Sequence, residues 1–84
     1  MKLEIIPLAS KKIKLRKIPL EWFNETVSKP EQVVEGYAGR KVAQRIYHRK
    51  GKRILLRVVL EKDPYKNVVV TAYLTSQIEK YWRE

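Results

Sequence analysis

Arginine and tyrosine side chains alternate with apolar residues in the second half of the chain, a pattern that suits phosphate chemistry. Arg57 and Tyr73 lie in two segments that are typical of β-strands, and Arg45 and Tyr47 lie in a third. Because side chains alternate between the two faces of a strand, all four share one sheet face if the first strand is in register. A guanidinium can hold a phosphate group with two hydrogen bonds, while a tyrosine can stack on an unpaired base or transfer a proton.

RNA is the phosphate ester that such residues can cleave without a metal ion. Its own 2′-hydroxyl group is the nucleophile, so cleavage needs in-line alignment, stabilisation of the charged phosphorane and a proton transfer. We hypothesise that Arg45 and Arg57 hold the phosphate group and that Tyr73 or His48 transfers the proton. The simpler alternatives are an ordinary strand arginine at position 57, cross-strand packing of Tyr47 and Tyr73, and a surface histidine beside a turn.

Residue types argue against other kinds of catalytic site. The 84 residues include no cysteine and one histidine, which excludes thiolate metal sites, cysteine nucleophiles and a two-histidine ribonuclease. The sequence has no glycine-rich phosphate loop and no zinc-ligand spacing. Glu61 and Asp63 are the one tight pair of carboxylates, and we interpret them as loop residues. The sequence therefore predicts neither a metal ion nor a cofactor.

The charge of the chain is strongly positive and unevenly distributed. Nineteen Lys and Arg residues against nine Asp and Glu residues give a net charge of +10. Two clusters of bases contain no acid: Lys11, Lys12, Lys14, Arg16 and Lys17, and then Arg40, Lys41, Arg45, Arg49, Lys50, Lys52, Arg53 and Arg57. Clustered bases are typical of proteins that bind nucleic acid; the alternative is a charged surface that only keeps a small protein soluble.

The middle of the chain predicts three consecutive strands, at residues 41–48, 54–60 and 68–74. A turn at 49–53 and a loop at 62–67 connect them. Because both connectors are short, we expect the strands to be antiparallel neighbours.

The two faces of this sheet differ in chemistry. Alternation in the last two strands gives one apolar face, formed by Ile54, Leu56, Val58, Leu60, Val68, Val70, Ala72 and Leu74. The opposite face carries Arg57, Thr71 and Tyr73. We expect this second face to be open, basic and aromatic.

Helices from the N-terminal part of the chain are expected to cover the apolar face. Residues 10–17 fit a helix or a strand, and we choose a helix, partly because the family resemblance described below implies one. Pro19 then begins a helix whose apolar positions are Leu20, Phe23 and Val27. Residues 30–35 predict another helical turn, closed by Gly36. Both tryptophans, Trp22 and Trp82, are expected in the core.

The ends of the chain add small elements. Residues 1–8 predict a short edge strand or a lead-in, and Thr75 or Ser76 can cap a last short helix with Ile78, Tyr81 and Trp82 on one side. We therefore predict one α+β domain over residues 1–84, with N-terminal helices packed on one face of a curved antiparallel sheet and a short C-terminal helix. Without a signal peptide or a membrane-spanning apolar segment, the expected location is the cytoplasm.

Several motifs in the chain resemble an uncharacterised family of small prokaryotic proteins that is similar to the RelE/ParE-type toxins and related ribonucleases. The resemblance covers about residues 8–82. Its motifs are Arg16-Lys17-Ile18-Pro19-Leu20-Glu21-Trp22, Glu25-Thr26-Val27, Pro30, Val33-Val34-Glu35, Gly39-Arg40-Lys41-Val42-Ala43-Gln44, Leu56-Arg57-Val58-Val59 and Val70-Thr71-Ala72-Tyr73-Leu74-Thr75-Ser76. It implies a RelE/ParE-like fold whose open sheet face meets RNA, and a neighbouring antitoxin protein that neutralises the toxin.

The resemblance also bears on individual residues. It implies functional roles for Arg16, Arg40, Arg57, Thr71 and Tyr73. Members commonly carry a histidine and an arginine in the first helix, where this sequence has Leu8 and Lys12, so it implies RNA binding more strongly than catalysis. The candidate catalytic residues are Arg57, Tyr73, Arg45 and His48, and the candidate RNA-binding residues are Arg16, Arg40, Tyr47, Thr71, Arg49 and Lys12.

Three functions follow as hypotheses. The first is a toxin of a toxin–antitoxin pair that acts as a metal-independent endoribonuclease. The second is a non-catalytic nucleic-acid-binding module of the same fold, and the third is a protein-interaction module whose basic face docks an acidic partner. The expected partners are RNA, on or off the ribosome, and a small antitoxin, with no membrane; a homodimer is left open.

Overall fold

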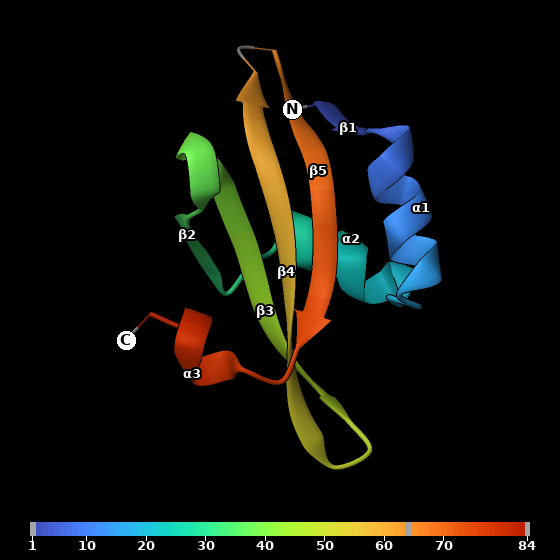
Figure 1. The fold of residues 1–84 in the computed structure, drawn as a ribbon, viewed down its shortest axis with the longest axis vertical. Helices are drawn as coiled ribbons and strands as arrows, with labels where there is room; N and C mark the ends of the chain where they lie inside the picture. The colour runs from blue at the N-terminus through green and yellow to red at the C-terminus, as the bar shows by residue number, and fades with distance from the viewer. Residues whose placement is uncertain (1, 64, 84) are drawn as a thin grey trace.

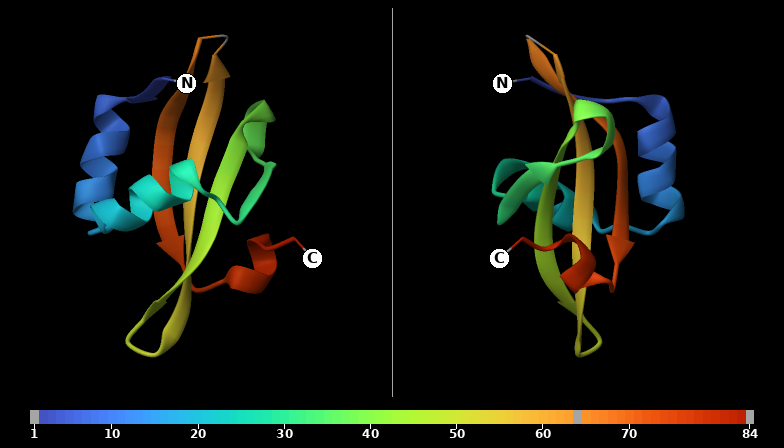
Figure 2. Two further views of the ribbon diagram at one scale, coloured as in Figure 1. Left: turned by 180° about the vertical axis from the view of Figure 1, so that it is seen from behind. Right: turned by 60° about the vertical axis from the view of Figure 1, so that its left-hand side comes forward.

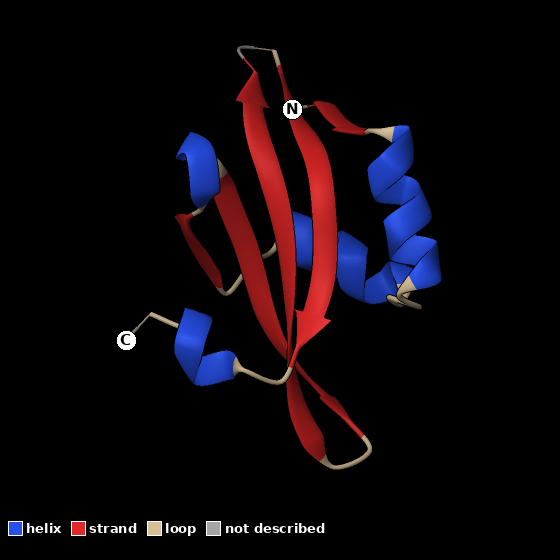
Figure 3. Cartoon of the chain, viewed as in Figure 1, coloured by secondary structure: helices blue, strands red, loops and turns tan. Residues whose placement is uncertain are grey.

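In the computed structural model, which describes residues 2–63 and 65–83, five strands form one mixed sheet in the order β1-β5-β4-β3-β2 (Figure 3). Three of them are consecutive in the chain: β3 spans Lys41–Arg49, β4 spans Lys52–Asp63 and β5 spans Lys66–Thr75. Neighbours among these three are antiparallel. The predicted meander is therefore confirmed, with strands longer than predicted.

An edge strand on each side completes the sheet. β1 spans Lys2–Ile5 and pairs with β5 in parallel, which confirms the predicted edge strand but makes the sheet mixed rather than antiparallel. β2 spans Gln32–Glu35 and pairs antiparallel with β3. The helical turn predicted for residues 30–35 is thus wrong. The β-branched Val33 and Val34 favour an extended chain, and pairing with β3 satisfies backbone groups that a single helical turn leaves open.

Two helices pack on one face of the sheet. α1 spans Pro7–Leu15 and starts earlier than predicted, because Pro7 lacks a backbone N–H and fits the first helical turn. α2 spans Leu20–Ser28 and begins where predicted. It passes behind the strands in Figure 1 and in front of them in the reversed view of Figure 2. Phe23 of α2 is buried, whereas Leu20, a predicted core position, is 66% exposed.

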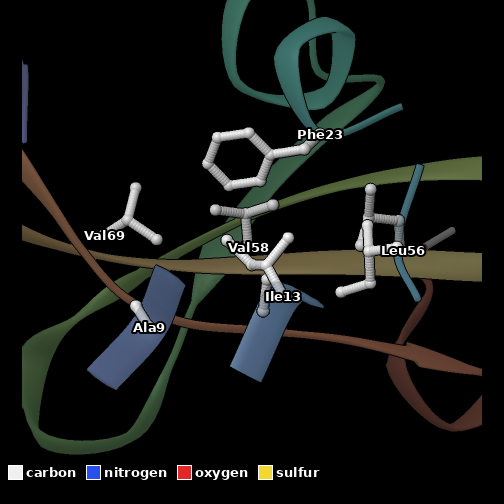
Figure 4. Packing of buried hydrophobic residues seen from close by; sticks show 8 residues of the cluster. Ala9, Ile13, Phe23, Leu56, Val58 and Val69 are labelled. Carbon is white, nitrogen blue, oxygen red and sulfur yellow. The ribbon is translucent and has the colours of Figure 1, made fainter. Parts of the chain in front are cut away.

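The core lies between these helices and the sheet. Eight buried residues form it: Ala9, Ile13, Ile18, Phe23, Leu56, Val58, Val69 and Ala72. In Figure 4 the Phe23 ring points from α2 toward Val58 on the sheet. The helices therefore cover the apolar face of the sheet, as predicted.

A β-bulge in β5 changes which valines face this core. Val59 pairs with Thr71 but the next residue, Leu60, pairs with Val69, so Val70 has no partner in β4. An extra residue in one strand reverses the alternation beyond it. Val69 is therefore fully buried in the core. The prediction that Val68 and Val70 face the core is wrong, because uninterrupted alternation cannot anticipate a bulge.

The last helix lies on the other face of the sheet. α3 spans Ile78–Tyr81, and Ile78 is buried. In the right-hand view of Figure 2, α3 crosses in front of the strands. No side chain caps it; instead Thr75 Oγ1 accepts a hydrogen bond from the Gln77 backbone N–H at 3.0 Å and shapes the preceding turn. The face expected to be open is thus partly covered by the C-terminal segment.

Two further features complete the fold. A 3-10 turn, η1, at Tyr37–Gly39 links β2 to β3. Within residues 2–63 and 65–83, no helix has the length and apolar character needed to cross a membrane.

Candidate nucleic-acid interface

The pairing of β3 with β4 separates the four residues that were expected to share one sheet face. Arg45 pairs with Leu56 and Tyr47 with Ile54, so both lie on the face that α1 and α2 cover. The predicted shared face is therefore wrong for these two residues. A five-residue turn would have paired Arg45 with Arg57. The observed turn has two residues, since β3 ends at Arg49 and β4 begins at Lys52, and this one-residue change of register moves each side chain to the opposite face.

Arg57 and Tyr73 do lie together, on the face opposite α1 and α2. Arg57 is 8% exposed, its Nε donates to Gln44 Oε1 at 2.9 Å and its Nη1 donates to the Tyr73 hydroxyl. The Tyr81 ring of α3 lies over the guanidinium, 4.0 Å from Cζ. None of the ion pairs in the described part of the chain includes Arg57. Amide, hydroxyl and aromatic groups thus stabilise this charge, and no acid neutralises it.

Gln44 holds this arrangement together. Its side chain is fully buried, and its Nε2 donates to Gln32 Oε1 at 2.8 Å and to the Tyr81 carbonyl at 3.1 Å. One amide therefore joins β2, α3 and Arg57. Gln44 pairs directly with Arg57 across β3 and β4, so the sheet register places it there.

On the helix-covered face, Tyr47 and Arg45 serve packing. The Tyr47 ring stacks on Trp22 with centroids 4.4 Å apart, which confirms the core position expected for Trp22. The Arg49 guanidinium lies over the Trp22 ring, with Cζ 4.9 Å from the ring centroid. Arg45 donates to the Lys29 carbonyl at 2.7 Å and pairs with Glu25 at 3.4 Å. These contacts leave no room for a base to stack between the rings.

The Tyr47 hydroxyl is bonded within the protein. It lies 3.2 Å from Thr26 Oγ1, and its single proton can go to either of two acceptors, the Trp22 carbonyl at 3.1 Å or Glu25 Oε1 at 2.9 Å. Burial raises the pKa of Tyr47, with the hydrogen bond to Thr26 opposing the rise and Glu25 adding to it. The hydroxyl therefore stays protonated at neutral pH and faces the protein.

The remaining predicted residues are dispersed. Arg16 donates to the Ala72 carbonyl at 2.7 Å and to Thr71 Oγ1 at 3.3 Å, which joins the end of α1 to the edge of β5. Arg40 pairs with Glu61 at 3.8 Å. Lys12 is half-buried and Leu8 is 57% exposed, both in α1 and thus across the sheet from Arg57. These positions form no single surface.

A basic hairpin stands apart from the rest of the fold. Residues 48–53, which we name the basic hairpin, join β3 to β4 and project beyond the other strands at the bottom of Figure 1. Its six residues are His48, Arg49, Lys50, Gly51, Lys52 and Arg53, so it contains four Lys and Arg residues and no acid. His48 and Arg53 are exposed and pair with each other across the strands.

Two hollows flank α3 on the same side of the sheet as Arg57. The larger, which we name the α3 crevice, has a volume of about 860 Å³ and is lined by Arg53, Ser76, Gln77, Ile78, Glu79, Lys80 and Trp82. The smaller, the Arg57 pocket, has a volume of about 260 Å³ and is lined by Val34, Glu35, Gly36, Tyr37, Arg57, Lys80, Tyr81 and Arg83. Lys80 lines both hollows, so the basic hairpin is connected through α3 to the buried guanidinium.

Sequence reasoning missed the contribution of the C-terminal segment. Lys80, Tyr81, Trp82 and Arg83 all line one of the two hollows. Trp82 is half-buried there but is not among the side chains packed against the core, so the core position predicted for it is not confirmed. The sequence signal available here was a pair of aromatic residues flanked by a lysine and an arginine, since that composition is typical of nucleic-acid contact.

The arrangement suits an anionic polymer rather than metal chemistry. In residues 2–63 and 65–83, no group of three or more His, Asp or Glu side chains is arranged to hold a metal ion. Lys and Arg side chains of the hairpin, of α3 and of β4 line adjacent hollows, together with aromatic rings and polar side chains. Such a surface can bind phosphate groups and stack bases.

No protein-family model, curated protein or solved structure matches this chain. Its function is therefore inferred from the geometry of the basic hairpin, the α3 crevice and the Arg57 pocket.

Proposed function

We propose that this protein is an RNA-binding module that holds the RNA backbone on the face formed by the basic hairpin and α3. The observation that supports it most is the position of the hairpin. The hairpin projects beyond the sheet and contains four Lys and Arg residues; Arg49 among them lies over Trp22 on the helix-covered face. Arg53 lines the α3 crevice together with Lys80, and Lys80 also lines the pocket that contains Arg57 and Arg83.

The candidate catalytic groups other than Arg57 and Tyr73 lie too far from this pair to act on the same phosphate group, which favours binding without catalysis. Arg45 and Tyr47 lie on the face that α2 covers, where Arg45 Nη1 donates to the Lys29 carbonyl and the Tyr47 hydroxyl donates within the protein. His48 pairs with Arg53, which is four residues from Arg57 along β4, or about 13 Å at the usual rise of a strand. A general base at that distance cannot act on a phosphate group held by Arg57, because proton transfer needs hydrogen-bond contact.

The test compares two variants of equal charge by fluorescence anisotropy with a labelled single-stranded RNA. The hairpin variant carries Lys50→Asn, Lys52→Gln and Arg53→Gln. The control variant carries Lys11→Gln, Lys14→Gln and Lys17→Asn, all in or just after α1. Each set lowers the net charge from +10 by three, to +7, and each places asparagine at a position of positive φ.

The proposal predicts that the hairpin variant loses at least tenfold in affinity while the control loses little. It also predicts a smaller dependence of affinity on salt in the hairpin variant, because fewer counterions are released when fewer phosphates are neutralised. Equal losses in the two variants would mean that only net charge matters. No binding by the unmodified protein at low salt would overturn the proposal, and an acidic protein partner would then be the better hypothesis.

A second candidate, the endoribonuclease of a toxin–antitoxin pair, is favoured by one contact. Arg57 donates to the Tyr73 hydroxyl, and the Arg57 pocket gives access to the guanidinium. In such a reaction the 2′-hydroxyl group of RNA loses its proton to water and its oxygen attacks phosphorus, while Arg57 stabilises the phosphorane. The bond from phosphorus to the 5′-oxygen then breaks, Tyr73 gives its proton to the departing oxygen, and water returns a proton to Tyr73. The products are a 2′,3′-cyclic phosphate and a 5′-hydroxyl group.

Incubation with labelled RNA in EDTA separates the two candidates. An enzyme yields fragments that end in 2′,3′-cyclic phosphate, and Tyr73→Phe, which removes only the hydroxyl group, abolishes them while RNA affinity is kept. A binding module retains RNA and yields no fragments with either protein.

A further inference from the structure

We infer that the α3 crevice is a subsite for one unpaired RNA base, with Trp82 as its stacking platform. The inference rests on the proposed RNA-binding function and adds a substrate class to it, single-stranded rather than duplex RNA. Three features of the crevice support it: a tryptophan ring with no other ring or cation stacked on it in the described part of the chain, a polar lining, and Arg and Lys side chains.

Trp82 differs from the other half-buried aromatic residues. Trp22 and Tyr47 stack on each other, and Tyr73 and Tyr81 meet edge to face with the Arg57 guanidinium close to both rings. In the described part of the chain, Trp82 makes no such contact with a ring or a cation, and it lines the α3 crevice. A large π face at the wall of a hollow is what a nucleobase needs in order to stack.

The rest of the lining matches the other parts of a nucleotide. Ser76 and Gln77 offer donors and acceptors for the edge of a base, and Arg53 and Lys80 offer cations for the flanking phosphate groups. Glu79 also lines the crevice and can accept hydrogen bonds from an amino group of a base. The volume of about 860 Å³ lies within the range of roughly 300–1,000 Å³ that is usual for small-molecule sites.

The stacking geometry leads to a preference for single strands. In a duplex both faces of each base are already covered by neighbours and its edge is paired, so no base can lie on Trp82 without being unstacked. In a single strand a base can turn outward at little cost. The basic hairpin attracts either form, because phosphate contacts do not distinguish them.

The first measurement uses Trp82 as its own reporter. Trp22→Phe keeps an aromatic ring against Tyr47 and leaves Trp82 as the one tryptophan of the chain. We expect a single-stranded oligonucleotide to quench the fluorescence of this variant as it binds. The same sequence as a blunt duplex should bind with little quenching. Equal quenching by both forms, or quenching by neither, would overturn the inference.

The second measurement changes the ring. Trp82→Leu keeps an apolar side chain without a π face, and Trp82→Phe keeps a smaller ring. We expect Trp82→Leu to lower the affinity for the single strand about tenfold and to leave the duplex unchanged. Trp82→Phe should restore most of the loss. Circular dichroism and the melting temperature of each variant check that the chain folds, and Trp82→Phe keeps the test informative if Trp82→Leu does not.

The outcomes separate this inference from the function on which it rests. If Trp82→Leu binds single strands as well as the unmodified protein does, while the hairpin variant loses affinity, the base subsite is wrong and RNA binding stands. If the unmodified protein binds neither form of RNA, both are wrong.

Discussion

At the scale of single residues, Arg57 is unusual because it is buried and forms no ion pair with an acid in the part of the chain that the structure describes. Its partners are the Gln44 amide, the Tyr73 hydroxyl and the Tyr81 ring. A charge that is stabilised by neutral groups keeps its attraction for an anion, whereas a salt bridge cancels it. The same contacts fix the guanidinium in place beside the Arg57 pocket.

These contacts predict the effect of Arg57→Leu on stability. The change leaves Gln44 Oε1 and the Tyr73 hydroxyl without the donor they now have, so we expect the free energy of unfolding to fall by about 1–3 kcal/mol. Urea denaturation measures it. Tyr73→Phe is the matched variant and should cost less, since it removes one partner and keeps the bond to Gln44. An unchanged midpoint in Arg57→Leu would contradict this account of the guanidinium.

The raised pKa of Tyr47 predicts that the free energy of unfolding depends on pH. Because the pKa of Tyr47 is raised by folding, both states are protonated below the usual tyrosine pKa and the full stability is present there. As the pH rises through that value, the unfolded chain ionises first and the free energy of unfolding falls. Tyr47→Phe removes this loss, so the decrease between about pH 9 and pH 11 should be smaller than in the unmodified protein.

At neutral pH the same change has the opposite effect. Thr26 is fully buried and its hydroxyl lies 3.2 Å from the Tyr47 hydroxyl, so Tyr47→Phe should cost about 1–2 kcal/mol. Urea denaturation at neutral pH gives the cost of Tyr47→Phe, and repeating it between about pH 9 and pH 11 gives the alkaline decrease in the free energy of unfolding. If the free energy of unfolding falls equally at alkaline pH in Tyr47→Phe and in the unmodified protein, groups other than Tyr47 cause the fall.

At the scale of elements, the two-residue turn of the basic hairpin decides which side chains share a face. Lys50 and Gly51 have φ of 51° and 75°, so both adopt the left-handed conformation that a type I′ turn requires. Glycine adopts it freely, but lysine does not. The sequence predicted a longer turn at this place, and the resulting register error put Arg45 and Tyr47 on the wrong face.

The strain at position 50 can be tested by relieving it. Asparagine tolerates positive φ and is favoured in type I′ turns, so Lys50→Asn should raise the free energy of unfolding by about 0.5–1 kcal/mol. Lys50→Gln removes the same charge without this preference and is the control. If the two variants are equally stable, the turn does not have the conformation described here.

The connection between β2 and β3 depends on a close approach of two segments. A Cβ atom added at Gly36 would lie 2.8 Å from Cγ2 of the buried Val42 and 3.3 Å from the Arg40 carbonyl oxygen. We therefore expect Gly36→Ala to lower the free energy of unfolding by about 1–3 kcal/mol. Adding Val42→Ala removes the nearer contact, so the double variant should lose less than the sum of the two single changes, as a double-mutant cycle by urea denaturation would measure.

At the scale of the whole molecule, the sequence predicted what depends on local pattern. The alternation in 54–60 and the short connectors predicted the meander, and the spacing of Phe23 and Val27 after Pro19 predicted the second helix that covers it. What it could not predict depends on pairing at a distance. The bulge at Val70, the strand at Gln32–Glu35 and the position of α3 are each decided by contacts between segments far apart in the chain.

The candidate site divides in the same way. Arg57 and Tyr73 were predicted together because they lie on adjacent strands, where a single connector sets the register. Lys80, Trp82 and Arg83 join them only because the Gln44 amide and the Tyr81 ring hold α3 against this face. No pattern within the C-terminal segment itself reveals that contact.

One measurement tests most directly which face of the protein meets RNA: the change in backbone amide resonances of the ¹⁵N-labelled protein as a single-stranded RNA is added. The account predicts that the shifts concentrate in the basic hairpin and in residues 76–83, with Arg57 and its neighbours affected next and α1 unaffected. Shifts that concentrate on α1 and α2, or no shifts at low salt, would contradict it.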